Sequence, residues 1–279
     1  MIGRHEEWLV NVGAQLYIYQ QRSQAEFGKP YEEALDQVFA QIRAAGYEGV
    51  ELPLALCGTP EDVQRVGDLL AAHGLQLPSA YGSGDFHDAA ANETVWAVLE
   101  QAAEAKPLGV RAITCNPTPA RGREKTDEEL RLQARWLDQL GSQLQSRGLN
   151  LALHFHAPEL AQGGRELWAD LDGTTKANVG VCLDVDWAWR GGVEPLMILQ
   201  KYGDRLVSLH VRDAQGGKWA QSLGEGAYDY RPIIERLRAL EFDGWVNVEL
   251  AYDDGMEWTR SVEENLRRSR EWVGSHFGV

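Results

Sequence analysis

Short apolar runs alternate with longer amphipathic stretches along almost the whole chain. The runs, which predict β-strands, are Leu9–Leu16, Gly49–Pro53, Leu75–Tyr81, Val110–Cys115, Leu149–His156, Val179–Asp184, Leu206–Val211 and Trp245–Leu250. The stretches that predict helices include Tyr31–Ala45, Pro60–His73, Ala89–Ala105, Asp127–Arg147, Tyr228–Leu240 and Glu257–Ser275. Strands and helices that alternate in this way over 279 residues match the size and order of an α/β fold, the (β/α)8 TIM barrel.

The joints between these segments carry residues that begin and end helices. A glycine, which can take the left-handed conformation that ends a helix, precedes four of the runs, at Gly46, Gly74, Gly148 and Gly244. Thr59 and Thr126 stand before acidic residues, as helix-capping hydroxyls do. A doubly wound open sheet is the main rival fold, but no glycine-rich phosphate-binding turn follows the first strand. No linker or change of composition divides the chain, so residues 1–279 are predicted to form one domain.

Composition and charge exclude several classes of protein. With 44% apolar and 25% charged residues, the chain is not disordered as a whole. No apolar run approaches the roughly 18 residues of a membrane-spanning helix. Glu6 and Glu7 are unlike the start of a secretory signal, so the expected location is the cytoplasm. The formal charge of −15 disfavours nucleic acid as a partner, and Cys57, Cys115 and Cys182 lie too far apart to suggest a disulfide framework or a thiolate zinc site.

Polar side chains interrupt the last four predicted strands in the same phase. Side chains alternate between the two faces of a strand, and one polar residue near each strand end lies opposite the apolar set: His154, Asp184, His210 and Glu249. The carboxyl ends of barrel strands meet at one mouth, so these side chains are expected to converge. Two carboxylates and two imidazoles buried together would be costly without a cation. We therefore predict one divalent metal ion, Mn²⁺ first, with Zn²⁺, Co²⁺, Fe²⁺ or Mg²⁺ as alternatives.

Further polar and aromatic residues belong to the same predicted mouth. Glu51, near the end of the second strand, and Arg212 are expected to bind the substrate, although Arg212 could instead pair with a neighbouring acid. Trp187 could stack on a sugar ring or pack a loop. His156 shares the face of His154 and is interpreted as a proton-transfer residue, an outer-shell contact of the metal site or a structural histidine.

Six segments, in this order, resemble the sugar phosphate isomerase/epimerase superfamily, the xylose isomerase-like barrels that include ketose epimerases, inosose dehydratases and apurinic endonucleases. They are Gly46–Glu51, His154–Glu159, Cys182–Trp187 with Gly191–Pro195, Asp204–Asp213, Gly224–Gly226 and Gly244–Glu249. The resemblance implies a TIM barrel, the same four metal ligands and a role in carbohydrate metabolism.

The fifth strand departs from the pattern of the ketose epimerases. They carry a Glu where this chain has His154, and a His three residues after the metal-binding Asp, where it has Trp187. The His-x-His-x-x-Glu form, which ends at Glu159, resembles the branch of keto-sugar-processing enzymes and inosose dehydratases. These departures argue against a symmetrical epimerisation by two carboxylates, but they leave the metal site intact.

The predicted chemistry is removal of a proton next to the carbonyl of a keto sugar or keto-glycoside. Such a C–H bond is too weak an acid to ionise at neutral pH, so a metal ion and an oriented base must stabilise the enediolate. Glu249 is the predicted base, and His156 and Glu159 are candidates for the second proton transfer. Return of the proton makes an isomerase or epimerase, the predicted activity, whereas loss of a β-leaving group makes a lyase or dehydratase.

Two remote alternatives and one question stay open at this point. An apurinic-site endonuclease would need further metal ligands and a basic groove, which the charge of −15 disfavours. A non-catalytic barrel that binds a sugar or a protein would be expected to have lost a metal ligand. A small sugar is thus the expected partner, with no membrane partner, and assembly into a homo-oligomer is left open.

Overall fold

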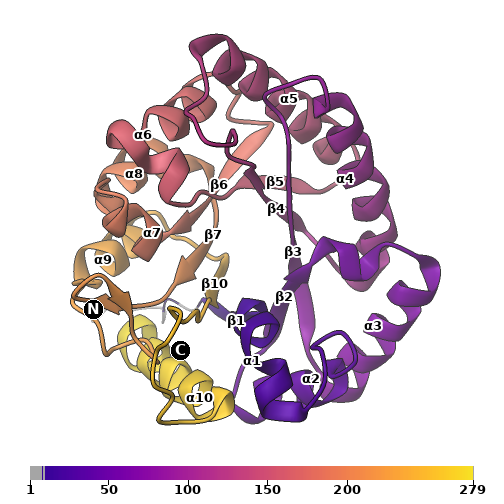
Figure 1. Cartoon of the computed structure of the whole chain (residues 1–279), viewed down its shortest axis with the longest axis vertical. Helices are drawn as coiled ribbons and strands as arrows, with labels where there is room; N and C mark the ends of the chain where they lie inside the picture. Colours follow the sequence, from indigo (N-terminus) through magenta and orange to yellow (C-terminus); the bar gives the residue numbers. More distant parts are fainter. Residues whose placement is uncertain (1–7, 9, 279) are drawn as a thin grey trace, which may run out of the picture.

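Eight parallel strands close into a barrel in the computed structural model, which describes residues 8 and 10–278. Figure 1 shows the ring of strands surrounded by helices, the predicted TIM barrel. Around the ring the order is β1-β10-β7-β6-β5-β4-β3-β2. The barrel strands are β1 (Asn11–Gln15), β2 (Gly49–Pro53), β3 (Gln76–Gly84), β4 (Ala112–Pro117), β5 (Asn150–Leu153), β6 (Val179–Asp184), β7 (Leu206–Val211) and β10 (Trp245–Val248). A small antiparallel ribbon, β8 (Ala214–Gln215) with β9 (Lys218–Trp219), follows β7.

Helices connect the strands and form the outer layer (Figure 1). They are α1 (Tyr17–Phe27), α2 (Leu35–Ala44), α3 (Pro60–His73), α4 (Ala91–Ala105), α5 (Asp127–Ser146), α6 (Ala157–Asp172), α7 (Val185–Arg190), α8 (Pro195–Tyr202), α9 (Arg231–Ala239) and α10 (Val262–Val273). Shorter helical turns are η1 (Leu54–Cys57), η2 (Lys106–Leu108), η3 (Gly203–Arg205) and η4 (Gly274–Gly278). None of the described helices is long and apolar enough to span a membrane.

The predicted segments and the observed elements agree closely where the sequence signals are strong. The bounds of β2, β6, β7 and α3 are those predicted. Thr59 accepts a hydrogen bond from the backbone of Asp62, and Thr126 forms a capping box with Glu129. Helix α1 was not predicted, because its buried residues, Ile18, Tyr19 and Ser23, form no continuous apolar stripe. Met1–Glu7, Leu9 and Val279 lie outside the described residues, so the single domain over residues 1–279 stays a prediction.

One of the four predicted helix-ending glycines has a different role. Gly46, Gly74 and Gly148 have the positive φ that was expected of them. Gly244 does not, and the left-handed residue after α9 is Glu241, with φ of 51°. A Cβ atom at Gly244 would lie 2.6 Å from the carbonyl oxygen of Val207. Glycine is therefore needed there for close packing against β7 rather than to end the helix.

Candidate metal centre

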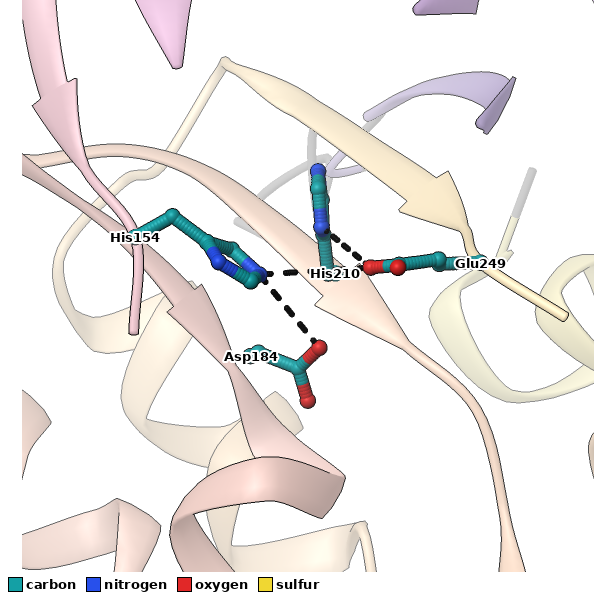
Figure 2. A group of neighbouring side chains, drawn as sticks. All are labelled: His154, Asp184, His210 and Glu249. Carbon is teal, nitrogen blue, oxygen red and sulfur yellow. Dashed lines mark hydrogen bonds and ion pairs between the residues drawn. The ribbon is translucent and has the colours of Figure 1, made fainter. Parts of the chain in front are cut away.

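The four predicted metal ligands come together at one end of the barrel. Their ligand atoms lie within 4.8 Å of one another, and all four side chains are buried. Figure 2 shows them pointing toward a common centre, from β6, from β7 and from the residues directly after β5 and β10. These four strands are neighbours in the ring, and backbone pairing continues past two strand ends, to the amides of His154 and Glu249. The period of two along each strand thus places the four side chains inside the barrel.

Asp184 is held by groups on either side of its carboxylate. Its Oδ1 accepts a hydrogen bond of 2.7 Å from the backbone N–H of Trp187 and thereby caps the start of α7. Its Oδ2 lies 2.6 Å from Nη2 of Arg212 and 3.5 Å from Nε2 of His154. Burial opposes ionisation, but Arg212 and His154 outweigh it and hold the pKa of Asp184 below its ordinary value. Asp184 is therefore a fixed carboxylate.

Glu249 presents its two oxygens to different surroundings. Its Oε2 lies 2.6 Å from Nδ1 of His210, 3.5 Å from Nη2 of Arg212 and 3.9 Å from Nε2 of His154. Within the described part of the chain, no side chain or backbone group hydrogen-bonds its Oε1, and Glu249 lines a cavity. Burial opposes ionisation, but Arg212 and His210 bring the pKa of Glu249 well below its usual range. One oxygen of an ionised carboxylate thus faces the open space.

Glu51 lies beneath the ligands and does not line the cavity, so the prediction that it binds the substrate is corrected. Its Oε2 accepts hydrogen bonds of 2.6 Å from Ser79 and 2.7 Å from Thr114. Its Oε1 lies 2.8 Å from Nε2 of His210, without the alignment of a hydrogen bond. A carboxylate that contacts the far nitrogen of a metal-binding histidine orients the ring. This contact places Glu51 where it can orient the ring of His210.

The side chains present fit a divalent metal ion. Nε2 of His154 is fully buried and has no hydrogen-bond partner among the described residues, although it faces oxygens of Asp184 and Glu249. A buried nitrogen without a partner is costly unless something else binds it. Two imidazoles with two carboxylates form a donor set for Zn²⁺, Mn²⁺, Fe²⁺ or Co²⁺. His154, Asp184, His210 and Glu249 are the residues that would hold the ion.

A cavity of about 870 Å³ opens above this cluster. Four predicted site residues line it, namely Glu249, His156, Trp187 and Arg212. Sequence reasoning missed other lining residues, among them Gln15, Tyr81, Asn116 and Trp219. The first three lie at or near the carboxyl ends of β1, β3 and β4, so the strand-end argument used for the last four strands would have found them. Trp219 lies in the β8–β9 ribbon, which the Gly216-Gly217 pair, typical of a two-residue hairpin turn, could have indicated.

His156 lies on the cavity wall between two polar neighbours. Its Nε2 is 3.5 Å from the hydroxyl of Tyr81, and its Nδ1 is 3.5 Å from Nδ2 of Asn116. Burial, helped by the nearby His154, lowers the pKa of His156 to about 3. The imidazole is therefore neutral at pH 7, with one ring nitrogen able to donate a hydrogen bond and the other able to accept one.

Arg212 and two indoles form another part of the wall. The guanidinium carbon of Arg212 lies 5.2 Å from the ring centroid of Trp187 and 5.0 Å from that of Trp219. The two indoles meet edge to face, with centroids 5.4 Å apart. Nε1 of Trp219 donates a 3.0 Å hydrogen bond to Asp186. These contacts fix the indoles as a rigid wall close to the ligands.

Glu159 is not brought into the cavity, which contradicts its predicted role in proton transfer. Its Oε2 accepts a 2.7 Å hydrogen bond from the backbone N–H of His156, at the start of α6. The side chain is 1% exposed and does not line the cavity. Burial raises the pKa of Glu159 to about 7. The carboxyl group caps a helix instead of facing substrate.

Comparison with known proteins identifies the family. A family model described as the xylose isomerase-like TIM barrel matches residues 39–275. The chain belongs to this family. An inosose dehydratase from Histophilus somni is 24% identical over 286 residues, covering 91% of this chain and 93% of the relative.

Two solved structures share this xylose isomerase-like fold across almost their whole length. D-Allulose 3-epimerase from Methylomonas sp., solved with D-allulose, has a TM-score of 0.74 at 15% identity and covers 96% of this chain and 97% of its own. The IOLI protein, solved with a zinc atom, has a TM-score of 0.73 at 17% identity and covers 96% and 98%. At these identities the structures show the fold alone. The relatives are thus enzymes whose names include both an epimerase and a dehydratase.

Proposed function

We propose that this protein is a divalent-metal-dependent isomerase or epimerase of keto sugars or keto-glycosides. The observation that carries the proposal is the convergence of His154, Asp184, His210 and Glu249 at the inner end of a cavity, with Oε1 of Glu249 open to it. The epimerase with a similar fold and the zinc atom of the IOLI protein support it. A divalent ion bound there supplies Lewis-acid polarisation of a carbonyl oxygen, which acidifies the adjacent C–H bond.

In this proposal the side chains of the cavity have separate roles in the reaction. Glu249 accepts the proton on Oε1, because Arg212 and His210 keep its carboxylate ionised. Trp187 and Trp219 exclude water from the inner end of the cavity. His156, a neutral imidazole within reach of Tyr81, is the second proton-transfer group in this proposal.

A dehydratase is the second candidate, and one observation favours it. Glu249 is the only carboxylate among the described residues that line the cavity. Epimerisation by two carboxylates therefore has no second partner there, whereas elimination needs only one acid–base group, because the proton that Glu249 takes from carbon can pass to the departing hydroxyl group, which leaves as water. The relationship to an inosose dehydratase supports the same outcome.

Proton exchange in D₂O separates the candidates. The apoprotein is loaded with Mn²⁺ and incubated with a panel of keto sugars and inososes, and products are followed by NMR. An epimer or isomer with deuterium at the α-carbon supports the first candidate, and an unsaturated product supports the dehydratase. Glu249→Gln, which removes both the base and one of the four proposed metal ligands, is expected to abolish exchange. Absence of exchange with every ketone of the panel would contradict both.

A further inference from the structure

The cavity above the metal centre offers no free cation to an anionic substrate. Among the described residues that line it, only Arg212 and Glu249 are charged. Nη2 of Arg212 lies 2.6 Å from Asp184 and 3.5 Å from Glu249, so its charge is already paired. A phosphate group usually requires an Arg, a Lys or a cluster of backbone N–H groups. The lining therefore favours an uncharged substrate.

The cavity also extends beyond the ring of strand ends. One part of its wall comes from the barrel mouth, including Arg212 and Glu249, and another from helix α4 and the turn η1, including Leu54, Ala97 and Val98. Helix α4 belongs to the outer layer of helices, as Figure 1 shows. The open space therefore reaches from the metal centre across the ends of β2 and β3 to this helix.

The two ends of the cavity differ in chemistry. The inner end lies next to the proposed metal ligands. It is lined by His156, Asn116 and the indoles of Trp187 and Trp219. The outer end is mostly apolar, with Pro53, Leu54, Ala55, Ala97 and Val98, and its polar side chains from α4, Thr94 and Gln101, are uncharged. The whole cavity, about 870 Å³, lies near the upper limit of the roughly 300–1,000 Å³ typical of sites for drug-sized ligands. A single monosaccharide ring would leave the outer end unfilled.

We propose that the substrate is an uncharged glycoside whose sugar lies at the metal centre and whose apolar aglycone occupies the outer end, against α4 and η1. The position of the reacting sugar rests on the proposed function. The assignment of the outer end rests on its own lining. Burial of an aromatic aglycone there strengthens binding by about 10- to 100-fold relative to the free sugar.

Ligand-observed NMR and calorimetry with three unreactive probes test this assignment. The probes are p-nitrophenyl β-D-glucoside, D-glucose and glucose 6-phosphate. The aryl glucoside is expected to bind most tightly, and the phosphate no more tightly than glucose. Ala97→Trp fills the outer end from an exposed helix position and is expected to weaken aryl glucoside binding at least about tenfold, with glucose binding unchanged. Glu100→Trp is the matched control, because Glu100 is exposed on the same helix and does not line the cavity.

Several results would overturn the assignment. These are equal affinities for glucose and its aryl glucoside, tighter binding of glucose 6-phosphate, or aryl glucoside binding that Ala97→Trp does not weaken. Ala97→Asp puts a charge at the same place, so it tests the apolar character of the outer end without filling it with a large side chain. These probes undergo no proton transfer, so a lack of exchange in D₂O would refute the proposed reaction and leave the outer-end assignment standing.

Discussion

Two groups of buried polar side chains, both among the described residues, are neutralised in different ways. One is the metal centre. The other, which we term the helix cluster, lies between α5 and α6 and consists of the buried Lys125, Gln133 and Asp170 with the partly buried Glu166. Lys125 Nζ lies 2.8 Å from Gln133 and 2.5 Å from Glu166, and the amide of Gln133 donates to both oxygens of Asp170.

The pKa shifts of the carboxyl groups separate the two groups. Burial and the nearby Glu166 raise the pKa of Asp170 well above its ordinary value. In the metal centre, Asp184 and Glu249 keep lowered pKa values despite burial, and among the described residues nothing hydrogen-bonds the buried Nε2 of His154. The helix cluster is completed by its own hydrogen bonds, whereas the metal centre leaves a buried nitrogen for which a bound cation would be a fitting partner.

The largest expected effect is on stability, in the helix cluster. Lys125→Met leaves Glu166 without its buried counter-charge and should lower the free energy of unfolding by about 3–5 kcal/mol. Metal affinity should stay the same, since the cluster lies outside the barrel. Urea denaturation and metal titration measure the two quantities. Lys176→Met, which breaks an exposed ion pair with Asp204, is the control and should cost less than about 1 kcal/mol. An unchanged unfolding free energy in Lys125→Met would contradict the comparison.

The next effect is loss of metal by His154→Ala. Removal of a ligand should weaken metal binding beyond the roughly 10–100-fold that follows the loss of an outer-shell partner. Metal content after dialysis and competition with a chelator measure it. His276→Ala, at an exposed position, is the control. Full metal content in the His154→Ala protein would remove this residue from the ligand set.

Glu51→Gln should have a smaller effect of the same kind. It replaces the carboxylate beside His210 by an isosteric amide, so we expect about 10–100-fold weaker metal binding. The exposed Glu61→Gln is the matched control. Because Glu51 does not line the cavity, sugar binding by the apoprotein should be unchanged. A weaker sugar affinity with normal metal affinity would restore the original prediction of a substrate contact.

The smallest effect concerns pH and Glu159, next to the helix cluster. Its pKa is raised to about 7 in the folded protein, so the folded state keeps a proton that the unfolded state loses, and stability falls as pH rises from about 4.5 to 7. Glu159→Gln removes this dependence. The difference in unfolding free energy between the Glu159→Gln variant and the original protein should shift in favour of the variant by about 1 kcal/mol as the pH rises from about 6 to about 8. A constant difference across this range would show that Glu159 is already ionised.

The metal centre was more predictable than the rest of the site, for a reason that lies in strand geometry. His154, Asp184, His210 and Glu249 follow a period of two on strands that are neighbours in the barrel, so their convergence follows from the fold. Glu51 has the same phase and the same residue type as a ligand, yet it lies one layer deeper, where Ser79 and Thr114 hold it. Pattern alone does not distinguish these depths.

Loops and helix starts were harder to predict. Glu159 lies five residues after a metal ligand, but its carboxylate turns back to the amide of His156, because helix α6 begins there. Trp219 reaches the cavity from a two-residue strand that no period could indicate. Both placements depend on the course of the backbone after the strand ends.

The order of apolar runs and helix caps determined the barrel, and the phase of four polar residues determined which side chains meet at its mouth, because both follow from the fixed periods of strands and helices. Tertiary structure alone decided how deep each carboxylate lies, which oxygen of Glu249 stays open and how far the cavity extends toward α4. These properties depend on contacts between segments far apart in the chain, and local periodicity carries no information about them.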